Sequence, residues 1–203
     1  MAPGFTDWHS HILPGVDDGV QSMDESLAIL RLYEGAGVSH VWLTPHIMED
    51  IPNTTDMLRA RFAELQEAYD GPVQLHLGSE NMLDNLFAER LDSGDLLPVG
   101  DGLLLVETSY FNPPMDLQDV LQEIRRRGYT PVLAHPERYL YMSRGDYSRL
   151  RDAGVSFQLN VSSPAGLYGS HVRRTACWLK RRGYYDYAGT DAHDLRMVQK
   201  ILG

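Results

Sequence analysis

Histidines and carboxylates recur along this sequence in short motifs whose spacing suits metal binding. His9 and His11 stand two residues apart at the end of a short apolar stretch. In an extended strand, residues two apart point to the same face, so these side chains would present two neutral imidazoles to one ion. Asp17 and Asp18 follow in a turn-rich segment. A solvated strand end would explain an isolated His-x-His motif, but the partners supplied later in the chain favour a metal site.

The later partners are imidazoles and carboxylates, and none of them is a thiolate. The full candidate set is His9, His11, Asp17, Asp18, His46, Glu80, Glu107, His135, Asp191 and His193. Nitrogen and oxygen ligands without sulfur suit manganese, iron or zinc in a catalytic site better than a structural zinc site. The set is too large for one ion, so we expect two or three divalent ions that share carboxylates. Without cations, so many buried carboxylates would repel one another in a medium of low dielectric constant.

Strands and helices alternate along the sequence, and the candidate ligands stand where predicted strands end. Strands are predicted at residues 5–8, 38–44, 73–77, 103–106, 130–134, 156–161 and 185–189. A helix is predicted from a capping box at Ser22 to Gly35, and others at 55–69, 83–91, 116–127, 146–153 and 170–182. Seven strands that alternate with helices imply a parallel α/β sheet.

A closed barrel and an open doubly wound sheet both fit this alternation. In a barrel the C-terminal ends of all strands converge on one face, whereas in an open sheet they would spread along an edge and the candidate ligands could not meet. We therefore expect a distorted (β/α)7 barrel with a metal site at the C-terminal ends of its strands. No linker, repeat or low-complexity tract divides residues 1–203, so we expect a single domain.

The composition argues against several classes of protein. Of the 203 residues, 43% are hydrophobic and 23% are charged, which are globular values. A formal net charge of -10 without a basic stripe argues against a nucleic-acid partner. The sequence has one cysteine, no apolar run of membrane-spanning length and no signal-peptide pattern at its start. These features predict a cytoplasmic protein without a membrane span.

The remaining histidines and the single cysteine have a structural interpretation. His40 starts a predicted strand, His76 lies inside one and His171 starts a helix. Cys177 lies on a predicted helix with apolar neighbours. A cysteine-dependent phosphatase would need an arginine six positions later, where this sequence has Gly183. We therefore expect no thiol nucleophile.

Taken in chain order, the motifs resemble those of the polymerase-and-histidinol-phosphatase (PHP) superfamily. They are His9-Ser10-His11, Pro45-His46, Gly78-Ser79-Glu80, His135-Pro136-Glu137-Arg138-Tyr139 and Asp191-Ala192-His193. The longer run from His11 to Gly19, together with 135–139, resembles the superfamily's branch of bacterial protein-tyrosine phosphatases. Those enzymes accompany tyrosine kinases of capsule and exopolysaccharide synthesis. The match spans essentially the whole chain.

The resemblance implies three metal ions, usually manganese, with iron and zinc as alternatives. Three ligand sets follow from the family pattern: His9, His11, Glu80 and Asp191; Glu80, Glu107 and His135; Asp18, His46 and His193. Asp17 belongs to none of these sets and is a candidate to support the ligands. Arg138 corresponds to the family arginine that binds the substrate phosphate.

The resemblance also implies metal-dependent hydrolysis of phosphotyrosine on a protein, with a bacterial tyrosine kinase as the expected substrate. Adjacent cations would activate water and clamp the phosphoryl oxygens, while Arg138 would bind the phosphate in bidentate fashion. Either His46 or His193, whichever is not saturated by metal, would protonate the leaving phenolate. An aromatic wall for the substrate ring would come from Tyr110, Phe111, Tyr139 and Tyr141. Two alternatives stay open, a small-molecule phosphatase such as a histidinol phosphatase and an inactive regulatory binding module.

The sequence departs from the family pattern after His193. Family members carry a further helical stretch there, whereas this chain ends at Gly203 and is short at its C-terminus. A second phosphate-contacting arginine also follows the last family motif, and Arg196 stands closer to His193 than the family spacing. Either the final strand-to-helix closure is incomplete, or a partner subunit in a homo-oligomer supplies it.

Overall fold

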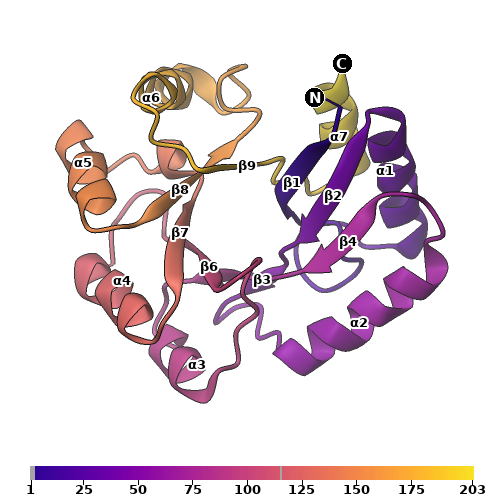
Figure 1. The fold of residues 1–203 in the computed structure, drawn as a ribbon, viewed down its shortest axis with the longest axis horizontal. Helices are drawn as coiled ribbons and strands as arrows, with labels where there is room; N and C mark the ends of the chain where they lie inside the picture. Colours follow the sequence, from indigo (N-terminus) through magenta and orange to yellow (C-terminus); the bar gives the residue numbers. More distant parts are fainter. Residues whose placement is uncertain (1–2, 115) are drawn as a thin grey trace.

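The computed structural model describes residues 3–114 and 116–203. Parallel strands curl around the centre of the molecule, and most helices lie outside them (Figure 1). The strands are β1 (Phe5–Ser10), β2 (Val38–Leu43), β3 (His46–Ile47), β4 (Gln74–Leu77), β5 (Glu80–Met82), β6 (Leu103–Glu107), β7 (Thr130–Ala134), β8 (Ser156–Asn160) and β9 (Tyr187–Gly189). They form two parallel sheets, β1-β2-β4 and β3-β5-β6-β7-β8-β9. The predicted parallel α/β architecture is confirmed.

The predicted count of seven strands is not confirmed, because two predicted strands, β2 and β4, are each followed by a further short strand. Thr44 and Pro45 separate β2 from β3, and Gly78 and Ser79 separate β4 from β5. Proline lacks the N–H that a sheet ladder needs, and a Cβ on Gly78 would lie 2.7 Å from Val99. At each interruption the chain passes from the three-stranded sheet to the six-stranded sheet. The described residues therefore form nine strands.

Backbone hydrogen bonds join β1 to the segment after β9. The amide of His11 donates to the carbonyl of Ala192 at 2.9 Å, and the amide of Asp191 donates to the carbonyl of His9 at 2.8 Å. Ser10 and Ala192 also form a parallel bridge. The first and last strands therefore lie side by side, and their C-terminal ends reach the same edge.

Six helices overlap the predicted ones, and two helical elements are additions, at Leu195–Leu202 and Pro136–Arg138. The helices are α1 (Met23–Gly35), α2 (Thr55–Ala68), α3 (Phe87–Ser93), α4 (Leu117–Arg126), α5 (Arg144–Asp152), α6 (Gly169–Arg181) and α7 (Leu195–Leu202), with a short 3-10 helix at Pro136–Arg138. The Oγ of Ser22 caps α1 by accepting from the amide of Glu25. In the ranges that the structure describes, no helix combines the length and hydropathy needed to cross a membrane.

Helix α7 was not predicted, since the sequence suggested an incomplete closure after His193. The Oδ1 of Asp194 caps it by accepting from the amide of Met197 at 2.7 Å. The amide of Leu195 donates to Glu25 Oε1 at 3.0 Å, which ties α7 to α1. Val198 is fully buried in the core cluster that α1 helps to form. The segment after the last strand thus packs on the first helix, and both described ends of the chain lie close together (Figure 1).

Candidate metal centre

The structure gathers all the predicted ligands at the C-terminal edge of the strands. His9 lies in β1, His46 opens β3 and Glu80 opens β5, while the others stand at a strand end or in a loop after one. The register pairs His46 with Glu80 directly, because β3 and β5 are parallel neighbours. The interruptions at Pro45 and Gly78 therefore bring an imidazole and a carboxylate side by side at this edge.

Four ligand atoms converge at the buried side of the centre. The Nε2 atoms of His9 and His11 lie 2.9 Å apart. Glu80 Oε2 lies 3.1 and 3.2 Å from these two nitrogens. Asp191 Oδ1 lies 3.5 and 3.4 Å from them. These are the residues that the family pattern assigns to the first ion.

The second oxygen of Glu80 faces a different direction. Its Oε1 lies 3.1 Å from His135 Nε2, which in turn lies 4.0 Å from Glu107 Oε2. Both carboxylates are almost completely buried. The two oxygens of Glu80 therefore face two separate groups of donors, as a bridging carboxylate would.

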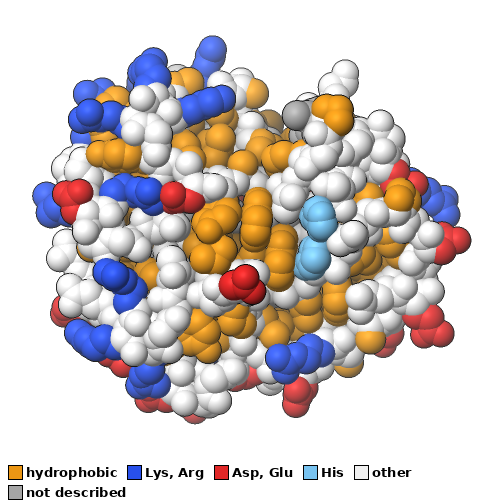
Figure 2. Space-filling view, in the orientation of Figure 1, with side chains coloured by type: hydrophobic (Ala, Val, Ile, Leu, Met, Phe, Trp, Pro, Cys, Tyr) orange, Lys and Arg blue, Asp and Glu red, His pale blue; other side chains and the backbone are white. Residues whose placement is uncertain are grey.

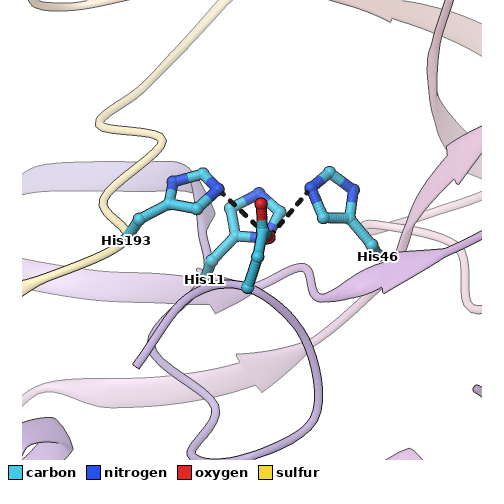
Figure 3. A group of neighbouring side chains, drawn as sticks. His11, His46 and His193 are labelled. Atoms are coloured by element: carbon cyan, nitrogen blue, oxygen red, sulfur yellow. Dashed lines mark ion pairs between the residues drawn. The ribbon is translucent and has the colours of Figure 1, made fainter. Parts of the chain in front are cut away.

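The third set lies on the more open side of the centre. Asp18 Oδ1 is 3.5 Å from His46 Nε2 and 3.6 Å from His193 Nε2. The imidazoles of His11, His46 and His193 gather around a carboxylate in Figure 3. The side chains of Asp18 and His193 are 64% and 30% exposed, so this is the side that solvent can reach.

Three overlapping groups of donors have ligand atoms within 4.8 Å of one another and contain all nine predicted ligands. They are His11, Asp18, His46 and His193; His9, Glu80, His135 and Asp191; and His46, Glu80 and Glu107. These groups divide the residues differently from the family pattern. His11 falls with the third set and His135 with the first, while His46 also falls with Glu80 and Glu107. The geometry brings the nine residues together, and their role as metal ligands stays a prediction.

Hydrogen bonds orient three of the imidazoles with Nε2 facing the centre. His9 Nδ1 donates to Gln158 Oε1 at 2.6 Å, His11 Nδ1 to Asp17 Oδ2 at 2.8 Å, and His193 Nδ1 to the carbonyl of Asp191 at 2.9 Å. An imidazole that donates from Nδ1 keeps a lone pair on Nε2, the arrangement that metal ligation requires.

The sequence identified one of these hydrogen-bond acceptors, Asp17, but not another, Gln158. Asp17 also accepts from the amides of Gly19 and His46, at 3.0 Å each, and so occupies the supporting position suggested for it. Gln158 was missed, because an amide in mid-strand carries no signal in the sequence. Its Nε2 donates to the carbonyl of Trp8 at 3.1 Å, which fixes its Oε1 toward His9.

Two of the candidate ligands stand in an unusual backbone conformation. His135 has φ 32° and Asp191 has φ 52°, and they are the non-glycine residues with positive φ among those described. The left-handed region costs an L-residue about 1–3 kcal/mol and persists where the surroundings impose it. Here it aims two side chains inward at the points where the backbone leaves β7 and β9.

Electrostatics couple the imidazoles to the carboxylates. Burial alone would lower the pKa of His11, but the carboxylates of Asp17, Asp191 and Glu80 hold it well above its usual range. Burial would raise the pKa of Glu80, but the charge of His9 and hydrogen bonds from His11 and His135 hold it well below its usual range. The centre therefore stabilises positive charge, whether protons or divalent ions carry it.

The donor chemistry fits divalent metal ions. The candidate ligands are nitrogen and oxygen donors, and three imidazoles have Nε2 lone pairs that converge with carboxylate oxygens. The buried Nδ1 atoms of His46 and His135 also have no hydrogen-bond partner among the described residues. Closely spaced lone pairs, such as those 2.9 Å apart on His9 and His11, need a cation between them.

Arg138 lies at the rim of the centre. Its Nη1 donates to Asp191 Oδ2 at 2.7 Å. The guanidinium stacks between the rings of Tyr110 and Tyr168, at 4.4 and 4.3 Å from their centroids. Arg138 does not pair with its sequence neighbour Glu137, which is fully buried. Its carboxylate instead accepts from the amide of Asn160 and the hydroxyl of Tyr185.

The aromatic surroundings differ from the predicted wall. Tyr139 is fully buried, and its hydroxyl accepts from the amide of Thr108, so it cannot line a substrate site. Tyr168 was missed, although its hydroxyl accepts from Asn160 Nδ2, which also donates to Asp191 Oδ2. Asn160 could have been noticed from its place near a strand end.

Phe111 and Arg196, two further residues singled out in the sequence, are both exposed. Phe111 is 69% exposed on the loop after β6. Arg196 is exposed in the first turn of α7, which gives no support to a role in phosphate binding. Cys177 is half-buried on α6.

Comparisons with known proteins agree with this architecture. A tyrosine-protein phosphatase of Bacillus subtilis, YwqE, is 25% identical over 197 residues, covering 94% of this chain and 78% of that protein. Tyrosine-protein phosphatase CpsB of Streptococcus pneumoniae is 27% identical over 201 residues, covering 93% and 83%. A crystal structure from work on YwqE and CpsB, described as unique metal-dependent tyrosine phosphatases, superposes with a TM-score of 0.88 at 24% identity, covering 96% of this chain and 81% of that one.

A more distant similarity indicates the broader fold. The phosphotriesterase homology protein of Escherichia coli superposes with a TM-score of 0.57 at 12% identity, over 100% of this chain and 87% of that one. A family model described as capsular polysaccharide synthesis, CpsB/CapC, matches residues 5–199. The resemblance found in the sequence motifs is thereby confirmed. Because the match covers nearly the whole chain, the protein belongs to the CpsB/CapC family of capsular polysaccharide synthesis.

Proposed function

We propose that this protein is a metal-dependent phosphatase that hydrolyses phosphotyrosine on proteins. The observation that carries the proposal is a cluster of five histidines and four carboxylates, mostly buried and open on the side of Asp18 and His193, with an arginine at its rim. Relatives across nearly the whole chain bear the name tyrosine-protein phosphatase. As a fold, we count β2 with β3 and β4 with β5 as interrupted strands of one distorted (β/α)7 barrel, and we treat residues 1–203 as one domain.

The centre would hold two or three divalent ions, with Mn²⁺ expected and Fe or Zn as alternatives. The ligands would be His9, His11, Asp18, His46, Glu80, Glu107, His135, Asp191 and His193. Glu80 would be shared between two ions, which is supported by its two oxygens facing different donors. When bound, the ions would activate a water molecule and neutralise charge on the phosphoryl oxygens.

Arg138 would bind the phosphate. One N–H of its guanidinium is already held by Asp191, and two tyrosine rings sandwich its plane, so the remaining donors are oriented in advance. A planar, oriented guanidinium suits bidentate binding to phosphate oxygens. With its side chain 19% exposed, Arg138 is partly accessible from solvent.

His193 or His46 would protonate the leaving phenolate. The His193 side chain is 30% exposed and that of His46 is 11% exposed, so an incoming substrate reaches His193 more readily. The Nδ1 of His193 donates to the carbonyl of Asp191, so its Nε2 would serve as the acid only in a state in which it does not ligate a metal ion. Tyr110 and Tyr168 replace the buried Tyr139 as the expected neighbours of the substrate ring.

The substrate would be a bacterial tyrosine kinase of capsule or exopolysaccharide synthesis, and the site of action the cytoplasm. The family description, which names capsular polysaccharide synthesis, supports the link to such a kinase.

Chelation tests the metal mechanism. Phosphate release from a phosphotyrosine peptide should stop after a chelator removes the metal and return when Mn²⁺ is added. Cys177→Ser should keep near-normal activity as a control, since this thiol lies on α6 outside the ligand set. Unchanged turnover in the stripped protein would refute the mechanism. Faster turnover of histidinol phosphate than of the peptide would favour a small-molecule phosphatase instead.

A further inference from the structure

A second pair of histidines lies away from the centre, on β2 and β4. His40 Nδ1 and His76 Nε2 are 3.0 Å apart, and their rings stack with centroids 5.3 Å apart. They precede His46 and Glu80 by six and four residues, a separation along the strands of roughly 13–20 Å at ~3.3 Å per residue. Figure 2 shows histidine side chains at the surface over β2 and β4, beside an apolar area.

Aromatic stacking makes this pair rigid. Trp42 is the register partner of His76 and stacks on it, with ring centroids 4.7 Å apart and planes at 19°. Trp8 stacks on Trp42 in turn, with centroids 5.9 Å apart and planes at 6°. The rings of Trp8, Trp42 and His76 therefore form one stack across neighbouring strands. This stack restricts the rotamer of His76 and so the position of its Nε2.

The pair also lacks the carboxylates that surround the other histidines. Among the described residues, no Asp or Glu lies within salt-bridge distance of His40 or His76. Burial and the proximity of His40 lower the pKa of His76. At neutral pH this imidazole is uncharged, so a nitrogen lone pair is available to a metal ion.

We propose that His40 and His76 form a second metal site that binds one late transition-metal cation, with Cu²⁺ held more tightly than Ni²⁺ or Zn²⁺. Two imidazole nitrogens bonded at ~2.0–2.1 Å to one ion lie roughly 2.9–3.4 Å apart for square-planar to tetrahedral angles, which matches the observed pair. Both side chains are half-buried, so water can complete the coordination. Because no carboxylate of the described residues takes part, hard ions such as Mn²⁺ or Mg²⁺ are excluded from this site.

The stacked tryptophan supplies a direct readout. Bound Cu²⁺ quenches the fluorescence of an adjacent indole, and Trp42 stacks on His76. The experiment is a Cu²⁺ titration of the Mn²⁺-loaded protein in a Trp178→Phe background, which removes the indole on α6. We expect saturable quenching by one equivalent of Cu²⁺, whereas Mn²⁺ and Mg²⁺ produce none.

Matched variants assign the quenching to the pair. His40→Gln and His76→Gln keep a polar side chain and should each weaken apparent Cu²⁺ affinity at least ~10-fold. His171→Gln, at an exposed histidine on α6, should leave it unchanged. Glu80→Gln should retain quenching, because the signal does not arise at the other centre. The proposal is overturned if wild-type protein is not quenched, if both pair variants bind Cu²⁺ as tightly as wild type, or if only Glu80→Gln loses the signal.

Discussion

Two clusters of histidines in this protein illustrate opposite electrostatic environments. At the C-terminal edge of the strands, His9 and His11 lie 2.9 Å apart among buried carboxylates. On β2 and β4, His40 and His76 lie 3.0 Å apart beside tryptophan rings. The nitrogen spacing is nearly the same, but the neighbours differ.

The neighbours determine the sign of the pKa shift. Burial lowers the pKa of an imidazole in both clusters, but Glu80 and Asp191 outweigh it for His9 and raise its pKa. The pKa of His76, without such carboxylates, is lowered. Neighbouring carboxylates therefore make a histidine cluster suitable for several hard or borderline divalent ions. A histidine pair alone favours one late transition metal.

The largest effect is expected from Glu80→Gln. This change removes the carboxylate that faces both His9 and His135, so two ion positions lose a ligand. Metal content should fall by at least one ion per chain, and turnover of a phosphotyrosine peptide should drop at least ~100-fold. Elemental analysis and steady-state kinetics measure both. Glu123→Gln on the surface of α4 is the control, and full occupancy in Glu80→Gln would contradict the bridging role.

Arg138→Ala should have the next largest effect and separates phosphate binding from metal binding. Catalytic efficiency should fall roughly 10- to 1000-fold with metal content unchanged, since one charge-assisted contact to the reacting group is lost. Arg138→Lys should recover only part of the activity, because an ammonium cannot reproduce the planar fork. Arg182→Ala, another arginine over an aromatic ring, serves as the control. If Arg138→Ala kept wild-type catalytic efficiency, the proposal that Arg138 binds the phosphate would be refuted.

Gly189→Ala should weaken the join between β9 and β1 beneath the centre. A Cβ at Gly189 would lie 2.4 Å from His9 Cβ and 2.8 Å from His9 N, so the backbone of β1 must shift. We expect a loss of about 1–3 kcal/mol in the free energy of unfolding, together with weaker metal binding. Denaturant unfolding and metal analysis check both. Gly35→Ala, where a Cβ meets nothing within 4 Å, should change stability by less than ~1 kcal/mol in the favourable direction.

The smallest effect concerns pH and the His40–His76 pair. The folded-state pKa of His76 is lowered below its ordinary value of 6.5, so the unfolded chain binds more protons as pH falls through that value. Protonation of His76 in the unfolded chain therefore lowers the free energy of unfolding as the pH falls below about 6.5. In His76→Gln the slope of Tm against pH between about 7 and 5.5 should be shallower. An unchanged slope relative to His171→Gln would contradict the shift.

Sequence reasoning identified the alternation of strands and helices because hydrophobic periodicity, caps and glycine stops are local signals. It also identified which strand ends carry imidazoles and carboxylates, since residue order alone places them there. The helix at Leu195–Leu202 was missed, because it is short and its packing on α1 depends on tertiary contacts, although Asp194 gives it a local cap. The short strands β3 and β5 were also missed, because the change of sheet at Pro45 and Gly78 depends on long-range pairing.

Residue order and local patterning were sufficient to identify the candidate ligands and the edge of the sheet on which they lie. The three-dimensional packing was needed to establish that the two oxygens of Glu80 face different imidazoles, that Gln158 supports His9, and that Arg138 pairs with Asp191. It was also needed to bring His40 and His76 together. Each of these contacts joins residues from different strands or the loops after them, and their distances depend on register and on the curl of the sheets. Local propensities specify where a strand begins and ends, but they do not specify which atoms of two distant strands come within about 3 Å of each other.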